Sequence, residues 1–189
     1  MMSTGIIVPI ISIFWIVSEI VLARFRQSGP DASKLDRSSL RMLWTTIALS
    51  VSFGVFLGVR GIGSVSTGST LIAWFGLILI FIGLGVRWTA ILTLRKSFTV
   101  DVSIRSDQRI VDKGIYRFVR HPAYAGSLLS FLGLGVSFSN WMSAPVIFFP
   151  ILLAFLYRIR IEERALLIFL GDGYIPYCAS TKRLIPGVY

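Results

Sequence analysis

The chain alternates between long apolar runs and shorter polar stretches. Five apolar runs stand out, at 6–23, 40–59, 71–94, 125–138 and 141–157. A helix needs about 20 mostly apolar residues to cross the hydrocarbon core of a bilayer, and only the run 125–138 is clearly shorter than that. The pattern therefore predicts an all-α integral membrane protein of about five transmembrane helices.

Local signals place the ends of two of these helices. Pro122 stands just before the short run, and because helices often begin next to a proline, the polar entry of this helix is expected to dip into the membrane. After residue 157 the chain continues with leucines on one helical face until Gly171, a favourable helix end. One helix is thus predicted to leave the membrane and continue beyond it. In the second run, Gly54 and Gly58 are spaced for close helix packing.

Composition agrees with this class. Apolar residues make up 54% of the 189 residues and aromatic residues 13%, and the mean hydropathy is +0.77, well above an ordinary soluble domain. The length leaves no room for a separate soluble domain, so we expect a single polytopic unit over 1–189.

The net charge of +10 is first a signal of topology. All lysines and arginines except Arg60 and Arg87 fall on one side of the predicted membrane. The positive-inside rule then places the N-terminus outside, and the loop between the third and fourth runs and the C-terminal tail in the cytoplasm. The basic side also favours contact with anionic membrane lipids, whereas nucleic acid is not an expected partner. One histidine, His121, and one cysteine, Cys178, cannot supply the four ligands of a zinc site, so no metal is expected.

Polar side chains gather at one membrane boundary. The stretch 112–126 holds Arg120 and His121 together with Tyr116 and Tyr124. Polar groups at such a boundary are costly to desolvate and indicate a functional site. The alternative is a basic surface loop anchored by its tyrosines.

Two further arginines have a structural and a functional interpretation. Arg87 lies inside an apolar run, where it needs an aqueous cavity or a partner such as Glu19, or must snorkel to the interface. Arg158 precedes Glu162 by one helical turn, which allows a simple ion pair. Glu163 diverges from Glu162 by about 100° around a helix, so at most one of the two is expected to face a site.

Two motifs carry a family resemblance. Residues 114–126, GIYRFVRHPAYAG, fit the pattern G-x-Y-x-x-x-R-H-P-x-Y-x-G. Residues 162–177, EERALLIFLGDGYIPY, fit E-E-x-x-L-x-x-x-F-G-x-x-Y-x-x-Y, with Leu170 where phenylalanine is usual. In these motifs and their order the chain resembles the isoprenylcysteine carboxyl methyltransferase (ICMT) family, in a short form typical of its prokaryotic members.

The resemblance implies a membrane enzyme that takes S-adenosylmethionine from the cytoplasm, releases S-adenosylhomocysteine and methylates a lipophilic or lipidated acceptor. It implies that 1–60 supplies N-terminal helices and that about 71–189 forms the catalytic part. Arg87 and Arg158 would position the acceptor carboxylate. The implied cofactor contacts are Gln108, Arg109, Ile110, Val111, Tyr116, His121, Pro122, Ala123, Tyr124 and Glu162.

The chemistry of the residues agrees with a carboxylate acceptor. Methyl transfer from a sulfonium to a carboxylate needs alignment and exclusion of water rather than a strong base, which suits a chain with one histidine. Two alternatives stay open: a methyltransferase acting on a phospholipid or another amine, and a membrane binding or scaffold protein of the same fold without turnover.

Overall fold

The computed structural model describes Trp15, Val17 and residues 34–94 and 110–189. Five α-helices and two short 3-10 turns follow one another in this part of the chain. They are α2 (Lys34–Arg60), α3 (Ser69–Leu94), η2 (Gly114–Arg117), α4 (Pro122–Ser137), α5 (Ser143–Leu170), η3 (Gly171–Gly173) and α6 (Tyr174–Ser180).

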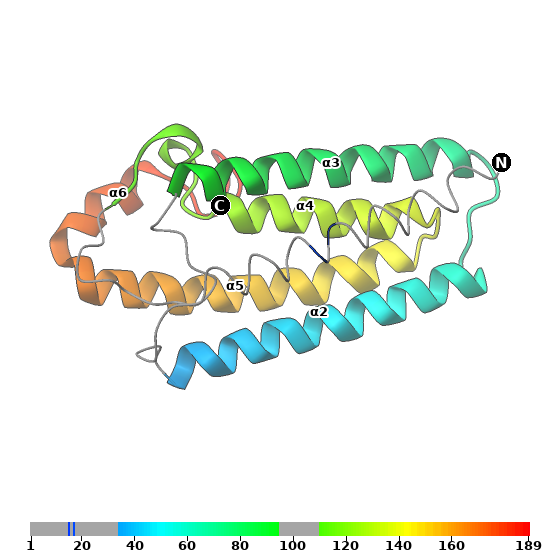
Figure 1. Cartoon of the computed structure of the whole chain (residues 1–189), viewed down its shortest axis with the longest axis horizontal. Coiled ribbons are helices and arrows are strands. Elements are labelled where there is room, and N and C mark those ends of the chain that lie inside the picture. Colours follow the sequence, from blue (N-terminus) through cyan, green and yellow to red (C-terminus); the bar gives the residue numbers. More distant parts are fainter. Residues whose placement is uncertain (1–14, 16, 18–33, 95–109) are drawn as a thin grey trace.

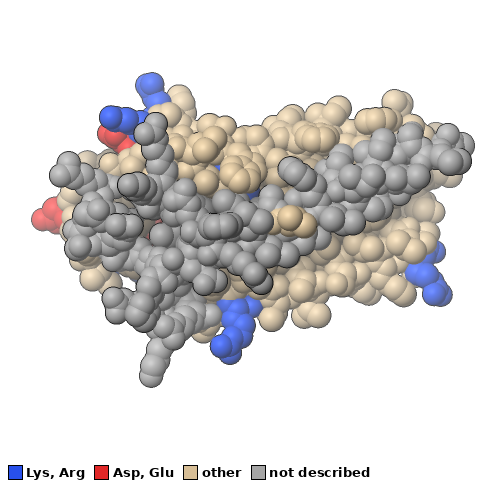
Figure 2. Space-filling model, viewed as in Figure 1, with Lys and Arg blue, Asp and Glu red and all other residues tan. Residues whose placement is uncertain are grey.

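The four long helices lie side by side in the order α3, α4, α5, α2 (Figure 1). Within the described residues, three helical segments are long and apolar enough to cross a membrane: α2 from Ser38, α3, and the segment that begins with α5. The core between the helices is mainly aliphatic, with Ile80, Ile147 and Ile151 completely buried. Uncharged side chains cover most of the described surface in Figure 2, whereas the visible carboxylates lie only toward the end that carries α6. Four of the five predicted helices are therefore confirmed.

The first predicted helix, 6–23, lies outside the described residues except for Trp15 and Val17, which are helical. Trp15 is buried, and its ring packs against that of Phe131 with 4.6 Å between the centroids.

The predicted helix ends are confirmed as well. Pro122 is the first residue of α4, where its missing N–H removes no helical hydrogen bond. Gly171 follows α5 with a positive φ of 56°, a backbone conformation that glycine adopts without strain. Between these points, α5 runs for 28 residues without a break, including Pro150. A single rigid element thus carries Arg158, Glu162 and Glu163.

Glycines bring α3 and α4 into backbone contact. A Cβ atom on Gly83 would lie 2.5 Å from the carbonyl oxygen of Gly126, and one on Gly133 would lie 2.6 Å from that of Gly76. Between them, the hydroxyl of Ser130 donates to the Ile80 carbonyl. Small residues thus allow the two helices to pack closely. The predicted packing role of Gly54 is also confirmed, because a Cβ there would collide with Ile147 of α5.

One end of the bundle is formed by two short connections, 61–68 and 138–142, which we call the turn end (Figure 1). Asn140 joins them. Its amide nitrogen donates to the carbonyls of Leu57 and Ile62, and its amide oxygen accepts from the backbone N–H groups of Met142 and Ser143. Neutral hydrogen bonds therefore hold this end.

The opposite end, which we call the site end, carries η2, the start of α4, the end of α5 and α6 (Figure 1). Here residues 181–184 return along the segment 118–121. The backbone N–H groups of Arg120 and His121 donate to the carbonyls of Lys182 and Arg183, and Lys182 donates to Phe118. Leu184 is buried in the core. The site end is thus closed by chain that follows α6.

Candidate active site

Arg87 is buried near the end of α3, at 8% exposure. Its Nη1 donates to the Ser127 hydroxyl at 2.8 Å and to the Ala123 carbonyl at 3.4 Å, both on α4. The close contact of α3 and α4 makes this reach possible, because a Cβ on Gly126 would lie 2.6 Å from the Arg87 backbone nitrogen. The suggested partner Glu19 lies outside the described residues.

Arg158, Tyr124 and Glu162 meet at one hydroxyl group. The Tyr124 hydroxyl donates to Glu162 Oε2 at 3.0 Å and accepts from Arg158 Nε at 3.2 Å. Arg158 is 1% exposed, and its Nη1 donates to the hydroxyl of Ser39 on α2 at 2.9 Å. The predicted interaction between Arg158 and Glu162 therefore runs through a tyrosine, and three helices contribute to it.

His121 lies between two carboxylates. Its Nε2 is 3.4 Å from Glu163 Oε1, and its Nδ1 is 3.9 Å from Glu162 Oε2. The imidazole is buried and stacks on the Tyr124 ring with 5.7 Å between the centroids. The imidazole thus lies between the two diverging side chains, and the expectation that at most one of Glu162 and Glu163 faces the site stays a prediction.

Tyr116 is the buried member of η2. It packs with Ala123 and with Ala90 and Ile91 of α3, and its backbone carbonyl accepts a hydrogen bond from the Tyr177 hydroxyl. Burial, reinforced by the nearby Glu162 carboxylate, raises the pKa of the Tyr116 phenol far above its ordinary value. Tyr116 is therefore a neutral group at physiological pH.

The remaining predicted cofactor contacts differ in burial, and two of them lie outside the described residues. Pro122 and Ala123 are buried in the first turn of α4. Ile110 and Val111 are half-buried in a stretch without helix or strand, whereas Gln108 and Arg109 lie outside the described residues. The structure thus brings together Arg87, Tyr116, His121, Pro122, Ala123, Tyr124, Arg158 and Glu162.

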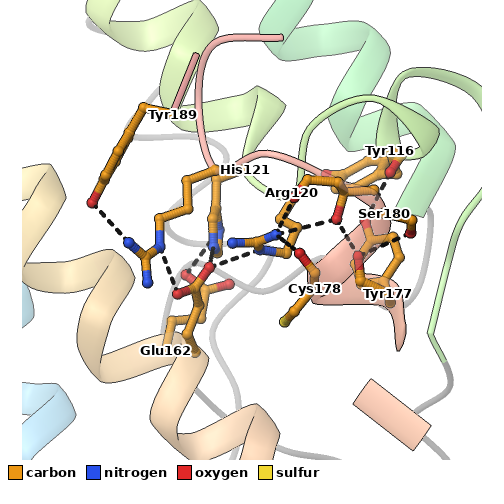
Figure 3. A network of polar contacts seen from close by, with 11 residues as sticks. Tyr116, Arg120, His121, Glu162, Tyr177, Cys178, Ser180 and Tyr189 are labelled. Atoms are coloured by element: carbon orange, nitrogen blue, oxygen red, sulfur yellow. Dashed lines mark hydrogen bonds and ion pairs between the residues drawn. The ribbon is translucent and has the colours of Figure 1, made fainter. Parts of the chain in front are cut away.

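An ion-pair cluster next to His121 was missed by the sequence interpretation. Glu163 binds Arg120 Nε through Oε1 and Arg183 Nε through Oε2, each at 2.8 Å. The hydrogen bond with Glu163 raises the pKa of the Arg183 guanidinium. Figure 3 shows Arg120 extending toward Cys178, whose carbonyl it also binds. The signal in the sequence was the second glutamate of the motif, but the return of the tail that supplies Arg183 leaves no local pattern.

Ser39 and Ser127, which hold the two arginines, were also missed. Both are single hydroxyl groups on helices and look like ordinary packing residues in the sequence. Ser127 follows Ala123 by one turn of α4, and that spacing is the signal that could have placed it beside Arg87 once the pairing of α3 and α4 was known.

The donor and acceptor groups fit a nucleoside-type methyl donor in their chemistry. The side chain of Glu162 is 29% exposed, so its carboxylate can accept hydrogen bonds from hydroxyl or amino groups of a ligand. Carboxylates and the ring of Tyr124 are also the surroundings that a sulfonium cation favours. The two arginines lie beside this set and offer cationic donors for an anion.

The fold and this site define a multi-pass membrane protein with paired arginines and carboxylates at one end of a helical bundle. Comparison with known proteins makes the class specific. Residues 76–168 match the family described as "Isoprenylcysteine carboxyl methyltransferase (ICMT) family". The match covers most of α3, all of α4 and most of α5, and in this part the chain is similar to the ICMT family.

Individual relatives agree with the family match. Protein-S-isoprenylcysteine O-methyltransferase B of Arabidopsis thaliana is 35% identical over 116 residues, which are 60% of this chain and 59% of that protein. Protein-S-isoprenylcysteine O-methyltransferase of Saccharomyces cerevisiae is 32% identical over 116 residues, 60% of this chain and 48% of the yeast protein. The matched part thus spans about half the length of these relatives.

A solved structure shares the fold. The eukaryotic intramembrane Ras methyltransferase ICMT superimposes with a TM-score of 0.58 and 27% sequence identity, over 82% of this chain and 53% of that one. The structural alignment covers a larger share of this chain, 82%, than the 60% that the two sequence matches cover.

Proposed function

We propose that this protein is a membrane-embedded, S-adenosylmethionine-dependent methyltransferase that esterifies the carboxylate of a lipophilic, isoprenylcysteine-like acceptor. The observation that carries the proposal is the meeting of Arg158, Tyr124 and Glu162 at one hydroxyl, inside the part that matches the family. It joins a buried cation, suited to an acceptor anion, to a partly exposed carboxylate, suited to a polar methyl donor.

The two arginines bind the acceptor. Arg87 and Arg158 are nearly free of solvent, and in such surroundings a charge-assisted hydrogen bond to a carboxylate is strong. They orient the carboxylate and keep it ionised, so the acceptor oxygen needs no general base. Their apolar surroundings among α3, α4 and α5 exclude water from the same place.

Glu162 and the tyrosines bind the donor. S-adenosylmethionine supplies a methyl group that its sulfonium charge has already activated for transfer. Glu162 accepts hydrogen bonds from hydroxyl or amino groups, and Tyr124, stacked on His121, provides an aromatic surface. Tyr116 closes this side as a neutral phenol, which adds no negative charge beside Glu162.

Methyl transfer from labelled S-adenosylmethionine to three acceptors tests the proposal on purified protein. They are a prenylated thiol carboxylic acid, the amide of the same compound and a phosphatidylethanolamine. We expect label only in the acid. Preferred labelling of the amine lipid would support the alternative of an amine methyltransferase, and titration calorimetry without any donor binding would support a scaffold protein.

The orientation in the membrane is part of the proposal. We infer that the site end faces the cytoplasm, because the basic residues gather toward it in the sequence. In a Cys178→Ser background, a cysteine at Asp172 of the site end should resist an impermeant thiol reagent in intact cells. A cysteine at Thr67 of the turn end should react. The opposite result would invert the topology.

A further inference from the structure

Glu163 joins three segments that lie far apart in the sequence. From α5 it binds Arg120 with one oxygen and Arg183 with the other. Its Oε1 also lies 3.4 Å from His121 Nε2. The side chain is 10% exposed. Two cations and an imidazole therefore compensate the cost of burying this carboxylate.

Residues 181–184, which we call the strap, are held by the same cluster. Arg120 Nη1 donates to the backbone carbonyls of Cys178 and Thr181 and to the Thr181 hydroxyl (Figure 3). Arg120 thus holds the chain just before the strap and at its first residue, and the backbone pairing with 118–121 holds the residues that follow. Arg183 then fastens the strap to α5 through Glu163.

The strap pairs with the segment 118–121, which leads directly into α4. The backbone N–H of His121 donates to the Arg183 carbonyl, and the His121 carbonyl accepts from the backbone N–H groups of Tyr124 and Ala125 in the first turn of α4. The imidazole in turn stacks on Tyr124, whose hydroxyl binds Glu162. A continuous series of contacts thus leads from Glu163 to the proposed donor site.

We propose that Glu163 is a positioning residue: it fixes the imidazole of His121 through Nε2–H and clamps the strap against 118–121, so that Tyr124 and Glu162 are held in place for the methyl donor. The part that concerns the donor rests on the proposed function, whereas the part that concerns His121 does not. Glu163 itself touches no reacting group; it acts through His121 and the strap.

The charge of Glu163 is essential to this role. A neutral amide at this position keeps the size of the side chain but offers one acceptor oxygen where three donors converge. Its NH2 group would face a guanidinium or the imidazole N–H. Glu163→Gln should therefore release His121 or the strap without creating a cavity.

His121 provides a direct readout, because it is the only histidine in the chain. In protein labelled with ¹⁵N-histidine, the ring signals need no further assignment. We expect a proton on Nε2 that exchanges slowly with solvent in the parent protein. Glu163→Gln should abolish this protection. Asp172→Asn, which changes an exposed carboxylate of η3, should not.

Donor affinity measures the second part of the proposal. Loss of a charged hydrogen bond that orders the site should raise the donor Kd roughly tenfold or more in Glu163→Gln. Arg183→Gln should raise it less, with Lys182→Gln as the matched control in the exposed position beside it. Because both changes act through one clamp, the double variant should bind no worse than Glu163→Gln alone.

Rescue separates positioning from mere stability. Glu163→Asp keeps the charge on a shorter side chain, so it should retain more donor affinity than Glu163→Gln at equal melting temperature. Unchanged exchange of the Nε2 proton in Glu163→Gln would overturn the proposal. A parent protein that binds no donor would instead refute the proposed function, and the histidine signal would still decide whether Glu163 holds His121. If Glu163→Gln does not fold, the signal is read in Arg183→Gln, where unchanged protection would likewise count against the clamp.

Discussion

The two ends of the bundle solve the same structural problem with different chemistry. At the turn end, one amide, Asn140, satisfies two carbonyls and two N–H groups from neighbouring connections. At the site end, Glu163 joins neighbouring segments through Arg120 and Arg183. Burying charges costs far more than burying an amide, even when they are paired. A fold that needed only a closed end could use an amide at both ends and would not require buried ion pairs. The presence of ion pairs at one end only therefore indicates function at the site end.

The largest effect is expected from replacing Arg158, the buried cation of the site end. Arg158→Met removes the group that contacts Tyr124 and Ser39, and with it the proposed charge-assisted contact to the acceptor. We expect a loss of roughly 2–4 kcal/mol of transition-state stabilisation, about 30- to 1,000-fold in kcat/KM, with donor affinity nearly unchanged. Steady-state methyl transfer and titration calorimetry measure the two quantities.

Arg160→Met is the control for this change, because Arg160 is exposed on the same helix two residues away. It should leave kcat/KM unchanged. An Arg158→Met protein that melts earlier but turns over normally would show that Arg158 serves stability alone.

The turn end should respond in the opposite way. Asn140→Ala leaves four backbone partners without the amide, and we expect about 2–3 kcal/mol lower stability. The donor Kd of the folded protein should stay at the parental value, because the site lies at the other end. Denaturant unfolding in micelles measures the first effect, and Thr67→Ala, in an exposed position of the other connection at the turn end, is the control. Weakened donor binding in Asn140→Ala would refute the separation of the two ends.

The contact between α3 and α4 links the ends. A Cβ at Gly126 would lie 2.6 Å from backbone atoms of Gly83 and Arg87, so Gly126→Ala must push the helices apart. We expect about 1–3 kcal/mol of destabilisation and a lower kcat, since Arg87 moves with α3. Gly85→Ala is the control: its Cβ meets nothing within 4 Å, and alanine favours a helix by up to about 1 kcal/mol. Equal melting temperatures of both variants would contradict the close contact.

The smallest expected effect concerns the support of Arg87. Ser127→Ala removes one hydrogen bond to a charged group, worth about 1.5 kcal/mol, and should raise the acceptor KM about tenfold. Ser130→Ala, one turn further on α4, is the control. The Ser130 hydroxyl donates to backbone carbonyls and not to Arg87, so its loss should leave the acceptor KM unchanged. A similar KM in both variants would remove Ser127 from the site.

The sequence was most informative where a single residue type sets local geometry. Pro122 and Gly171 predicted helix ends because proline lacks an N–H and glycine accepts a positive φ. Gly54 predicted close packing because it has no side chain. These signals act within one or two turns of helix, and the structure confirms them.

Contacts between distant segments left no comparable signal. Ser39 reaches Arg158 across 119 residues, and Arg183 returns to Glu163 from the tail. The divergence of adjacent residues by about 100° also did not predict that Glu162 and Glu163 would both approach His121, because it describes where side chains leave a helix and not where a neighbouring ring lies. Tertiary contact, rather than helical periodicity, decides which carboxylate belongs to the site.

The unbroken course of α5 has a consequence for depth. Arg158 and Glu162 are separated by four residues, about 6 Å along the helix axis at 1.5 Å per residue. A helix of 28 residues without a break cannot easily change this offset. In the proposed function, the acceptor arrives from the lipid and binds Arg158, and the donor arrives from water and binds Glu162. The helix would then hold the two ligands at a fixed difference in height. Substrates that carry their reactive group too deep or too shallow would be rejected by length before any side chain discriminates between them.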